Sequence, residues 1–219
     1  MASGSSDFDN PGAADMAGTT RRPVRPRDAA SLILWRETRR GPEVLMGRRH
    51  PRLRFMPDVL VFPGGRVDRG DARAPAGSEL RPEVAAALNR VGGRARAIAM
   101  AAVRELREET ALSLGPPEAP DLACLDYLCR AVTPPDRPIR FNARFLIAPA
   151  EAAQGRIASS GELAELGFYT PAEAQAARMA SITALILAEF LRWHALPPAE
   201  RAGRQPVRFL GMNRRYPER

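Results

Sequence analysis

The sequence predicts an α/β (α+β) domain in which helices pack on a mixed β-sheet. Apolar runs of strand length recur along the chain, at residues 29–35, 43–46, 59–62, 122–132 and 139–147. Helical periodicity is strongest at residues 94–114 and is also clear at residues 181–194. Because strands and helices alternate without an internal repeat, we expect one mixed sheet covered by helices.

The first three strands are expected close together in the chain. Residues 29–35 form one apolar run, and a Gly-Pro pair turns the chain into residues 43–46, so we expect a hairpin. Residues 59–62 are expected to form a short third strand, which a Pro-Gly-Gly triplet ends.

Two helices are expected next. Residues 81–91 predict a short helix with Pro82 near its first turn, and a double glycine ends it. Residues 94–114 predict the strongest helix of the chain, which Gly115 and two prolines close.

The second half adds a strand at residues 163–169 and a helix at residues 171–179, before the helix at residues 181–194. Cys124 and Cys129 are five positions apart in the run at residues 122–132. If that run is one strand, they face opposite sides, which favours core packing over a disulfide.

Length and composition suggest one domain with additions at both ends. The chain has 219 residues, of which 45% are hydrophobic. Residues 1–27 have no hydrophobic period and are expected to be a flexible arm, residues 28–195 the domain, and residues 196–219 a basic tail that docks on the domain or on a partner subunit. A homodimer is therefore left open. No apolar run is long enough for a membrane span, and no signal core is visible, so we expect a cytoplasmic protein.

The chain is strongly basic, with a formal net charge of +8, and all 33 basic residues are arginine. Arginine binds phosphate groups bidentately, so this charge is compatible with nucleic acid, acidic lipid or a small polyphosphate. The sequence argues against nucleic acid, because only 6% of residues are aromatic and no nucleic-acid module is visible.

The helix at residues 94–114 carries a cluster of carboxylates. Glu105, Glu108 and Glu109 lie at positions i, i+3 and i+4, beside an apolar stripe that is expected to face the sheet. Such a cluster repels itself unless a cation lies within it, and oxygen ligands suit Mg²⁺ or Mn²⁺. The alternative is a solvated acidic face that pairs with neighbouring arginines.

A glycine turn precedes this helix in the chain. Gly64 and Gly65 follow Phe62 and Pro63, and the absence of a Cβ atom lets their backbone approach a neighbouring element or a phosphate. A turn of this kind beside a carboxylate-rich helix favours a combined metal and polyphosphate site.

These residues resemble the pattern of the Nudix hydrolase superfamily, G-x5-E-x7-R-E-U-x-E-E-x-G-U, where U is aliphatic. Gly65 and Asp71 match its first part, and residues 104–112, which read Arg-Glu-Leu-Arg-Glu-Glu-Thr-Ala-Leu, match its second part. Asp71 stands where Glu is usual and Ala111 where Gly is usual. The two parts are separated by 32 residues rather than seven, so an insertion of 25 residues is expected at residues 72–96. The resemblance implies a Nudix-type α/β/α sandwich over roughly residues 28–195.

A second motif resembles the coenzyme A diphosphatase-like branch of the superfamily, L-L-T-x-R-[SA]-x3-R-x3-G-x3-F-P-G-G. Arg49, Arg54 and the Phe-Pro-Gly-Gly run that starts at Phe62 fall in register, whereas Gly47, His50 and Asp58 depart from it. The resemblance implies that Arg49, Arg54, Phe62, Gly64 and Gly65 bind substrate, with coenzyme A or its acyl derivatives as the leading candidate. The alternative for the two arginines is a solvated basic loop.

The resemblance also implies a mechanism. Water would attack one phosphorus of a nucleoside diphosphate linked to another moiety, with Mg²⁺ or Mn²⁺ held by Gly65, Glu105, Glu108 and Glu109. Arg104 would fix the carboxylates. A further glutamate of the segment 161–168, Glu162 in preference to Glu165, would act as base or ligand.

Other functions stay open at this stage. A related enzyme would cleave ADP-ribose, a nucleotide sugar or a dinucleotide, and a Nudix module without catalysis would sense a nucleotide. A third hypothesis, an RNA-binding protein, rests on charge alone.

Overall fold

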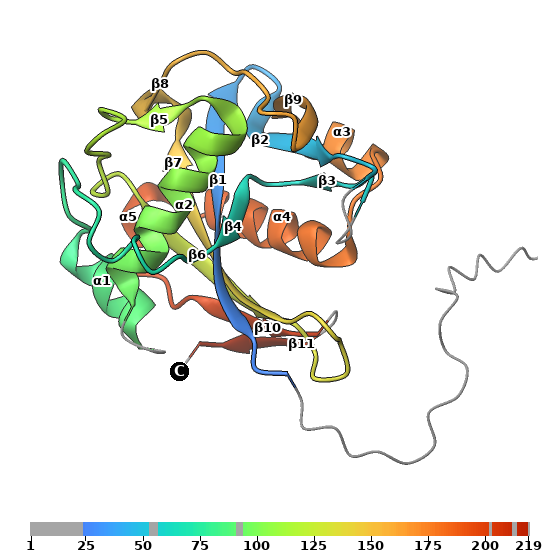
Figure 1. Ribbon diagram of the computed structural model, residues 1–219. Helices are drawn as coiled ribbons and strands as arrows, with labels where there is room; N and C mark the ends of the chain where they lie inside the picture. The colour runs from blue at the N-terminus through green and yellow to red at the C-terminus, as the bar shows by residue number, and fades with distance from the viewer. Residues whose placement is uncertain (1–23, 53–56, 91–93, 202, 212–213, 219) are drawn as a thin grey trace, which may run out of the picture.

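In a computed structural model, the chain forms an α/β/α sandwich that is described for residues 24–52, 57–90, 94–201, 203–211 and 214–218. Helices α1 and α2 lie on one side of the central sheet and α4 lies on the other (Figure 1). The predicted α/β class with a mixed sheet is therefore confirmed. No helix of the described chain combines the length and the apolar character that crossing a membrane requires.

The main sheet has nine strands in the described part of the chain. They are β1 (Arg27–Thr38), β2 (Gly41–Arg49), β3 (Leu60–Val61), β4 (Gly64–Arg66), β6 (Asp126–Val132), β7 (Phe141–Pro149), β9 (Leu163–Tyr169), β10 (Val207–Leu210) and β11 (Arg214–Pro217). The pairs β1–β7 and β10–β6 are parallel and the other pairs are antiparallel, so the sheet is mixed. Two short strands, β5 (Ser113–Leu114) and β8 (Ala153–Gln154), form a separate pair.

The strand β1 organises the sheet because two different strands share one of its edges. Along one edge it pairs with β7 over its apolar length. Along the other edge its first half pairs with β4, where Ala30 is opposite Gly65, and its last residues pair with β2, where Trp35 is opposite Val44. The Leu32 N–H bridges the division by donating to the Pro63 carbonyl at 3.0 Å. The Pro-Gly-Gly triplet therefore leads into a further strand, β4, and does not only end β3.

The helices are α1 (Pro82–Asn89), α2 (Ala95–Thr110), α3 (Pro171–Ala176), α4 (Ser181–His194) and α5 (Pro198–Arg201), with a short 3₁₀ turn at Ala150–Ala152. Small side chains give α2 a close fit on the sheet, since Ala99, Ala102, Val103 and Leu106 are all buried. The predicted apolar stripe of α2 is therefore confirmed.

Two apolar clusters hold the layers together. On the α2 side, Leu32 and Leu34 of β1 pack with Ile98 and Leu106 of α2. On the α4 side, Ile33 of β1 packs with residues of α4 and of the neighbouring strands. Successive residues of β1 thus point to opposite faces, as a strand buried on both sides requires.

Two expected element boundaries are wrong by four residues, and the helix expected at residues 171–179 ends at Ala176. Helix α2 ends at Thr110 rather than at 114, because Ala111 adopts a left-handed conformation with φ of 60° and the chain then enters β5. Strand β6 begins at Asp126, so Cys124 lies in the turn before it, and only Cys129 belongs to the strand, where it is buried. In both places the apolar residues continue past the true boundary without a turn residue, so the sequence pattern predicts an element that is too long.

The two ends of the chain, which were expected to be additions to the domain, have different outcomes. Residues 1–23 of the expected arm lie outside the described residues, and Arg27 already belongs to β1. The described residues of the segment 196–219 dock on the domain, because they supply α5, β10 and β11. Val207 and Phe209 of β10 enter the α4-side cluster, so this segment completes the core.

A buried carboxylate attaches β11 to α4. Glu189 of α4 is 1% exposed and forms ion pairs with Arg192, Arg204 and Arg215 at 3.0–3.1 Å. A buried charge of this kind is stable only when it is compensated, and here the compensation comes from three arginines.

Replacing Glu189 by alanine should destabilise the domain strongly. Arg204, whose side chain is 13% exposed, would keep its charge without this partner, so we expect a loss of about 3 kcal/mol in the free energy of unfolding. Urea denaturation followed by circular dichroism measures it. Glu151→Ala on the exposed 3₁₀ turn is the control and should stay within about 0.5 kcal/mol. Equal losses in the two variants would contradict a stabilising role for this network.

Candidate functional site

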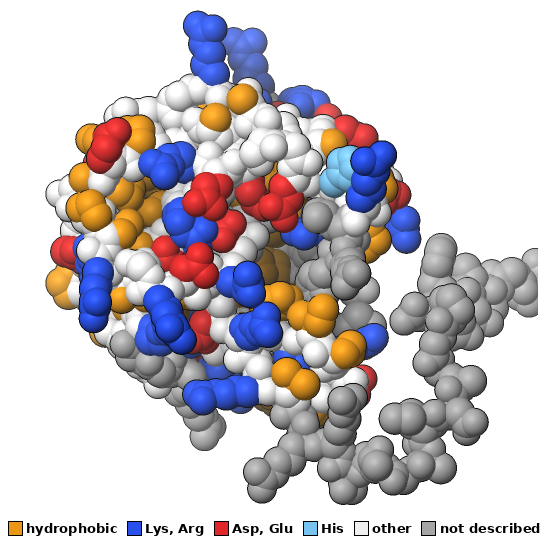
Figure 2. Space-filling view, viewed as in Figure 1, with side chains coloured by type: hydrophobic (Ala, Val, Ile, Leu, Met, Phe, Trp, Pro, Cys, Tyr) orange, Lys and Arg blue, Asp and Glu red, His pale blue; other side chains and the backbone are white. Residues whose placement is uncertain are grey.

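The carboxylates of α2 lie beside β4, where the chain runs antiparallel to the start of β1. Figure 2 shows acidic and basic side chains gathered over the region of α2 on this face of the molecule. The last two turns of α2 supply the charged residues of the candidate site, which are Arg104, Glu105, Glu108 and Glu109. The structure therefore brings together the glycine turn and the acidic helix, which are about forty residues apart in sequence.

Glu109 is the most deeply placed of the three glutamates. It is 3% exposed, and its Oε2 atom accepts a hydrogen bond of 2.9 Å from the Gly64 N–H. This bond fixes the end of α2 to the start of β4. A bulkier residue at Gly64 is excluded, because a Cβ atom there would lie 2.5 Å from the Ala30 carbonyl oxygen.

Gly65 makes room for Glu105. A Cβ atom at Gly65 would overlap the Glu105 carboxylate, whose side chain is only 15% exposed. Glycine is required at position 65 because it has no side chain that would collide with Glu105, and not because of its conformational freedom. The prediction that the double glycine permits a close approach is confirmed for both glycines.

Arg104 connects the acidic groups of the site. Its Nη1 atom donates to Glu105 at 2.8 Å and to Glu108 at 3.1 Å, and its Nη2 atom donates to the Arg66 carbonyl at 2.9 Å. Its Nε atom donates to Asp71 at 3.0 Å. The expected contacts of Arg104 with the carboxylates are therefore present, and they extend to the backbone of β4.

Asp71 is the residue whose part in the site the sequence left undefined. It is 4% exposed, and besides Arg104 it accepts a hydrogen bond of 2.7 Å from the Asp68 N–H. The signal was available in the pattern, since Asp71 occupies its first acidic position, but a separation of 33 residues from Arg104 hid the pairing.

The segment after β8 brings one more carboxylate toward the site. Glu162, whose side chain is 47% exposed, accepts a hydrogen bond of 3.4 Å from Arg49 of β2. Glu165 instead pairs with Arg48 at 2.9 Å. The structure thus separates the two glutamates by partner, and the preference for Glu162 remains a prediction.

The structure does not support a substrate contact for the other two side chains predicted to bind substrate, Arg54 and Phe62. Arg54 lies outside the described residues. Phe62 is 5% exposed and belongs to the α4-side apolar cluster, so its side chain packs inside the domain.

Burial makes two carboxyl groups of the site, Glu109 and Glu105, harder to ionise. Burial raises the pKa of Glu109 to about 8, against the Gly64 hydrogen bond that lowers it, and the negative charges of Glu162 and Glu105 raise it further. Burial likewise raises the pKa of Glu105, although Arg104 opposes the shift. The negative charge of Glu162 contributes to the raised pKa of both Glu105 and Glu109, so Glu162 lies near both carboxyl groups.

A divalent cation is compatible with this donor set. Within the described ranges, no three acidic, histidine or cysteine side chains are gathered closely enough to form a preformed metal cluster. Arg104 draws Glu105 and Glu108 toward itself, and Gly64 holds Glu109. The chemistry nevertheless fits, because the donors are hard oxygen atoms whose mutual repulsion a cation would relieve, and the glycine backbone leaves space beside Glu105.

Helix α2 ends where the site requires it. Ala111 adopts the left-handed conformation, its N–H donates to the Arg107 carbonyl, and the Thr110 hydroxyl donates to the Leu106 carbonyl at 2.6 Å. Because this conformation favours glycine, it gives a physical reason for the glycine in the pattern that Ala111 replaces.

Comparison with known proteins assigns the fold. A scan against protein-family models finds no match for the chain. A Caenorhabditis elegans protein to which the name nudix hydrolase 7 has been given by inference is 42% identical over 84 residues, which are 38% of this chain and 21% of that protein. The chain thus spans about a fifth of the length of this curated relative.

Among solved structures, a NUDIX hydrolase from Alicyclobacillus acidocaldarius matches with a TM-score of 0.62 and 21% identity, over 87% of this chain and 99% of that chain. The MutT protein from Methanosarcina mazei Go1 matches with a TM-score of 0.52 and 13% identity, over 81% of this chain and 100% of that chain. The chain therefore has the fold of Nudix hydrolases.

The raised pKa of Glu109 should make the metal-free protein less stable as the pH rises. Between the pKa of an ordinary glutamate, about 4.5, and the folded-state value of about 8, the folded protein holds a proton that the unfolded chain has lost. The free energy of unfolding should fall by about 1.4 kcal/mol per pH unit in this window. Urea titrations in EDTA between pH 5.5 and 8.5 measure the slope.

The variant Glu109→Gln mimics the protonated side chain and should flatten this dependence. Glu151→Gln, on the exposed 3₁₀ turn, should keep the parental slope. An unchanged slope in Glu109→Gln would contradict the assignment of the pH dependence to this carboxyl.

Proposed function

We propose that this chain is a Nudix hydrolase that uses Mg²⁺ or Mn²⁺ to cleave the pyrophosphate bond of a nucleoside diphosphate linked to another moiety. The observation that carries the proposal is the connection of Arg104 with Glu105, Glu108 and Asp71 beside a glycine backbone that no side chain blocks. A solvated acidic face would not need a buried Glu109 that is hydrogen-bonded to the backbone of β4.

Different residues of the site would bind the cation and position its ligands. Glu105, Glu108 and Glu109, with the backbone of Gly65, would hold the cation, which when bound polarises phosphoryl oxygens and acidifies water. Arg104 keeps the carboxylates of Glu105 and Glu108 on one side of α2, which lowers the cost of assembling the donors.

Glu162 is the proposed acceptor of the proton from the attacking water. Its carboxylate lies at the edge of the site and is about half exposed, so water reaches it. Arg49 of the neighbouring strand β2 donates a hydrogen bond of 3.4 Å to it, which would orient the carboxylate toward the site.

Coenzyme A or an acyl derivative is the leading substrate of the proposal. Arg49, on the side of β2 that faces Glu162, would contact a phosphate of such a ligand, and its sequence partner in the motif is Arg54. The insertion proposed at residues 72–96 contains α1, which packs against α2.

A substrate panel tests the proposal. With Mg²⁺ or Mn²⁺ present, coenzyme A should be hydrolysed at its pyrophosphate bond, and ADP-ribose, a nucleotide sugar and a dinucleoside polyphosphate complete the panel. Glu108→Gln should lower kcat/KM more than about 100-fold, because a lost metal ligand removes several kcal/mol of charge stabilisation. Glu108 is half exposed, so the circular dichroism spectrum should not change.

The control Glu151→Gln should retain full activity, since that residue lies on the exposed 3₁₀ turn. Nucleotide binding without turnover of any panel member would overturn the hydrolase proposal in favour of a sensing module.

Gly65→Ala tests the space beside Glu105 separately. The added methyl group would displace the Glu105 carboxylate, so we expect kcat/KM to fall about tenfold or more. The flexible side chain of Glu105 can move, so the unfolding midpoint should change little. Gly70→Ala is the matched control, because a Cβ atom there meets no atom within 4 Å. Equal activities of the two variants would contradict the proposed role of this space.

A further inference from the structure

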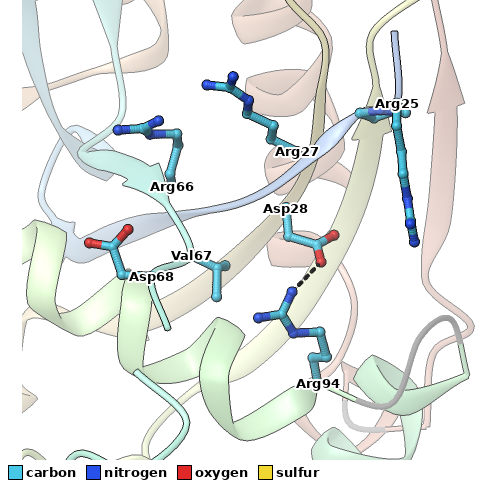
Figure 3. A pocket seen from close by; sticks show the side chains of 8 residues that line it. Arg25, Arg27, Asp28, Arg66, Val67, Asp68 and Arg94 are labelled. Carbon is cyan, nitrogen blue, oxygen red and sulfur yellow. Dashed lines mark hydrogen bonds and ion pairs between the residues drawn. The ribbon is translucent and has the colours of Figure 1, made fainter. Parts of the chain in front are cut away.

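A hollow of about 470 Å³ lies at the start of β1, beside the end of β4 and the beginning of α2. Arg25, Arg27, Arg66 and Arg94 line it together with Asp28 and Asp68, among others. Figure 3 shows this hollow from close by, with the arginines arranged around the start of β1. Its lining is therefore predominantly basic.

Two of these arginines form a pair on one face of the sheet. Arg66 of β4 is directly opposite Ala29 of β1, and Arg27 lies two residues before Ala29. Alternation along a strand places Arg27 and Arg66 on the same face as diagonal neighbours. In Figure 3 their side chains extend to the same side, whereas Arg25 points the other way.

The acidic residues of the hollow do not neutralise this pair. Asp28 points to the opposite face, where it accepts hydrogen bonds from Arg94 at 2.9 Å and from the buried Arg144 at 2.6 Å. Asp68 has its nearest ion-pair partner in Arg104, at 4.0 Å. Within the described residues, no carboxylate forms an ion pair with Arg27 or Arg66.

Like charges that face each other across neighbouring strands repel, so an unneutralised arginine pair favours an anion between the two guanidinium groups. Arg66 also connects this pair to the candidate catalytic site. It follows Gly65 directly, and its carbonyl accepts the hydrogen bond from Arg104. An anion held by Arg66 would thus lie beside the chain segment that shapes the carboxylate site.

We propose that Arg27 and Arg66 bind a phosphate monoester of the substrate, distinct from the pyrophosphate that is cleaved. This inference rests on the proposed hydrolase function and narrows its substrate class to nucleotide conjugates that carry an additional phosphate. A guanidinium pair binds the two charges of a monoester bidentately and discriminates against the free hydroxyl.

Kinetics with substrates that differ by one phosphate test the inference. The ratio of kcat/KM for coenzyme A to that for 3′-dephospho-coenzyme A should exceed unity in the parent protein, and the ratio for NADP⁺ to NAD⁺ applies the same comparison to a 2′-phosphate. The double variant Arg27→Ala/Arg66→Ala should lower the ratio about tenfold or more, as expected from the loss of charge-assisted hydrogen bonds.

The control removes the same charge elsewhere. Arg39→Ala/Arg90→Ala changes two exposed arginines, one in the β1–β2 turn and one after α1, and should keep the parental ratio. If both double variants lose the preference equally, general electrostatic attraction explains it and the assigned pair is overturned. A preference that survives in Arg27→Ala/Arg66→Ala also overturns the inference.

Binding without catalysis separates this inference from the proposed function. In EDTA, calorimetry should show tighter binding of adenosine 3′,5′-bisphosphate than of adenosine 5′-monophosphate to the parent protein, and equal binding to Arg27→Ala/Arg66→Ala. Failure of every substrate to turn over would overturn the hydrolase proposal, while this difference would still support the phosphate site. Equal binding of both nucleotides to the parent would overturn the phosphate site alone.

Discussion

The close approach of β4 to α2 is the constraint on which the site depends. Ordinary side chains at Gly64 and Gly65 would push β4 away from β1 or displace Glu105. The approach is possible because β1 offers one edge to two strands in succession, so that β4 can pair with its first half while β2 pairs with its end. The sheet topology thus places a bare stretch of backbone against the acidic end of a helix.

Charge balance around this contact is local and asymmetric. Arg104 pairs with the carboxylates on the outer side of α2 and with the buried Asp71, whereas Glu109 on the inner side accepts a hydrogen bond from the Gly64 N–H. The inner side is therefore the place where burial shifts a pKa toward neutrality. A cation would be attracted to this inner side because Glu109 receives a backbone N–H there rather than the guanidinium hydrogen bonds that Arg104 gives to Glu105 and Glu108.

Local patterns in the sequence were sufficient for most elements and for the acidic helix, since its carboxylates and its apolar stripe follow from residue spacing alone. The sequence could not show that Asp71 binds Arg104, because the pairing depends on how the intervening residues fold back. The sequence prediction also extended α2 past Thr110, because alanine at position 111 does not by itself indicate a left-handed backbone conformation. Long-range pairing and single backbone conformations are the parts that periodicity does not encode.

The parallel pairing of β10 with β6 has a consequence for synthesis of the protein. Val207 pairs with Cys129, which lies 78 positions earlier in the chain, and both belong to the α4-side cluster, so this cluster is completed only when β10 has been made. The ribosome releases the chain in order, and the α2 half can close first. The part of this cluster that β10 covers would therefore stay exposed in the nascent domain until Val207 and Phe209 emerge.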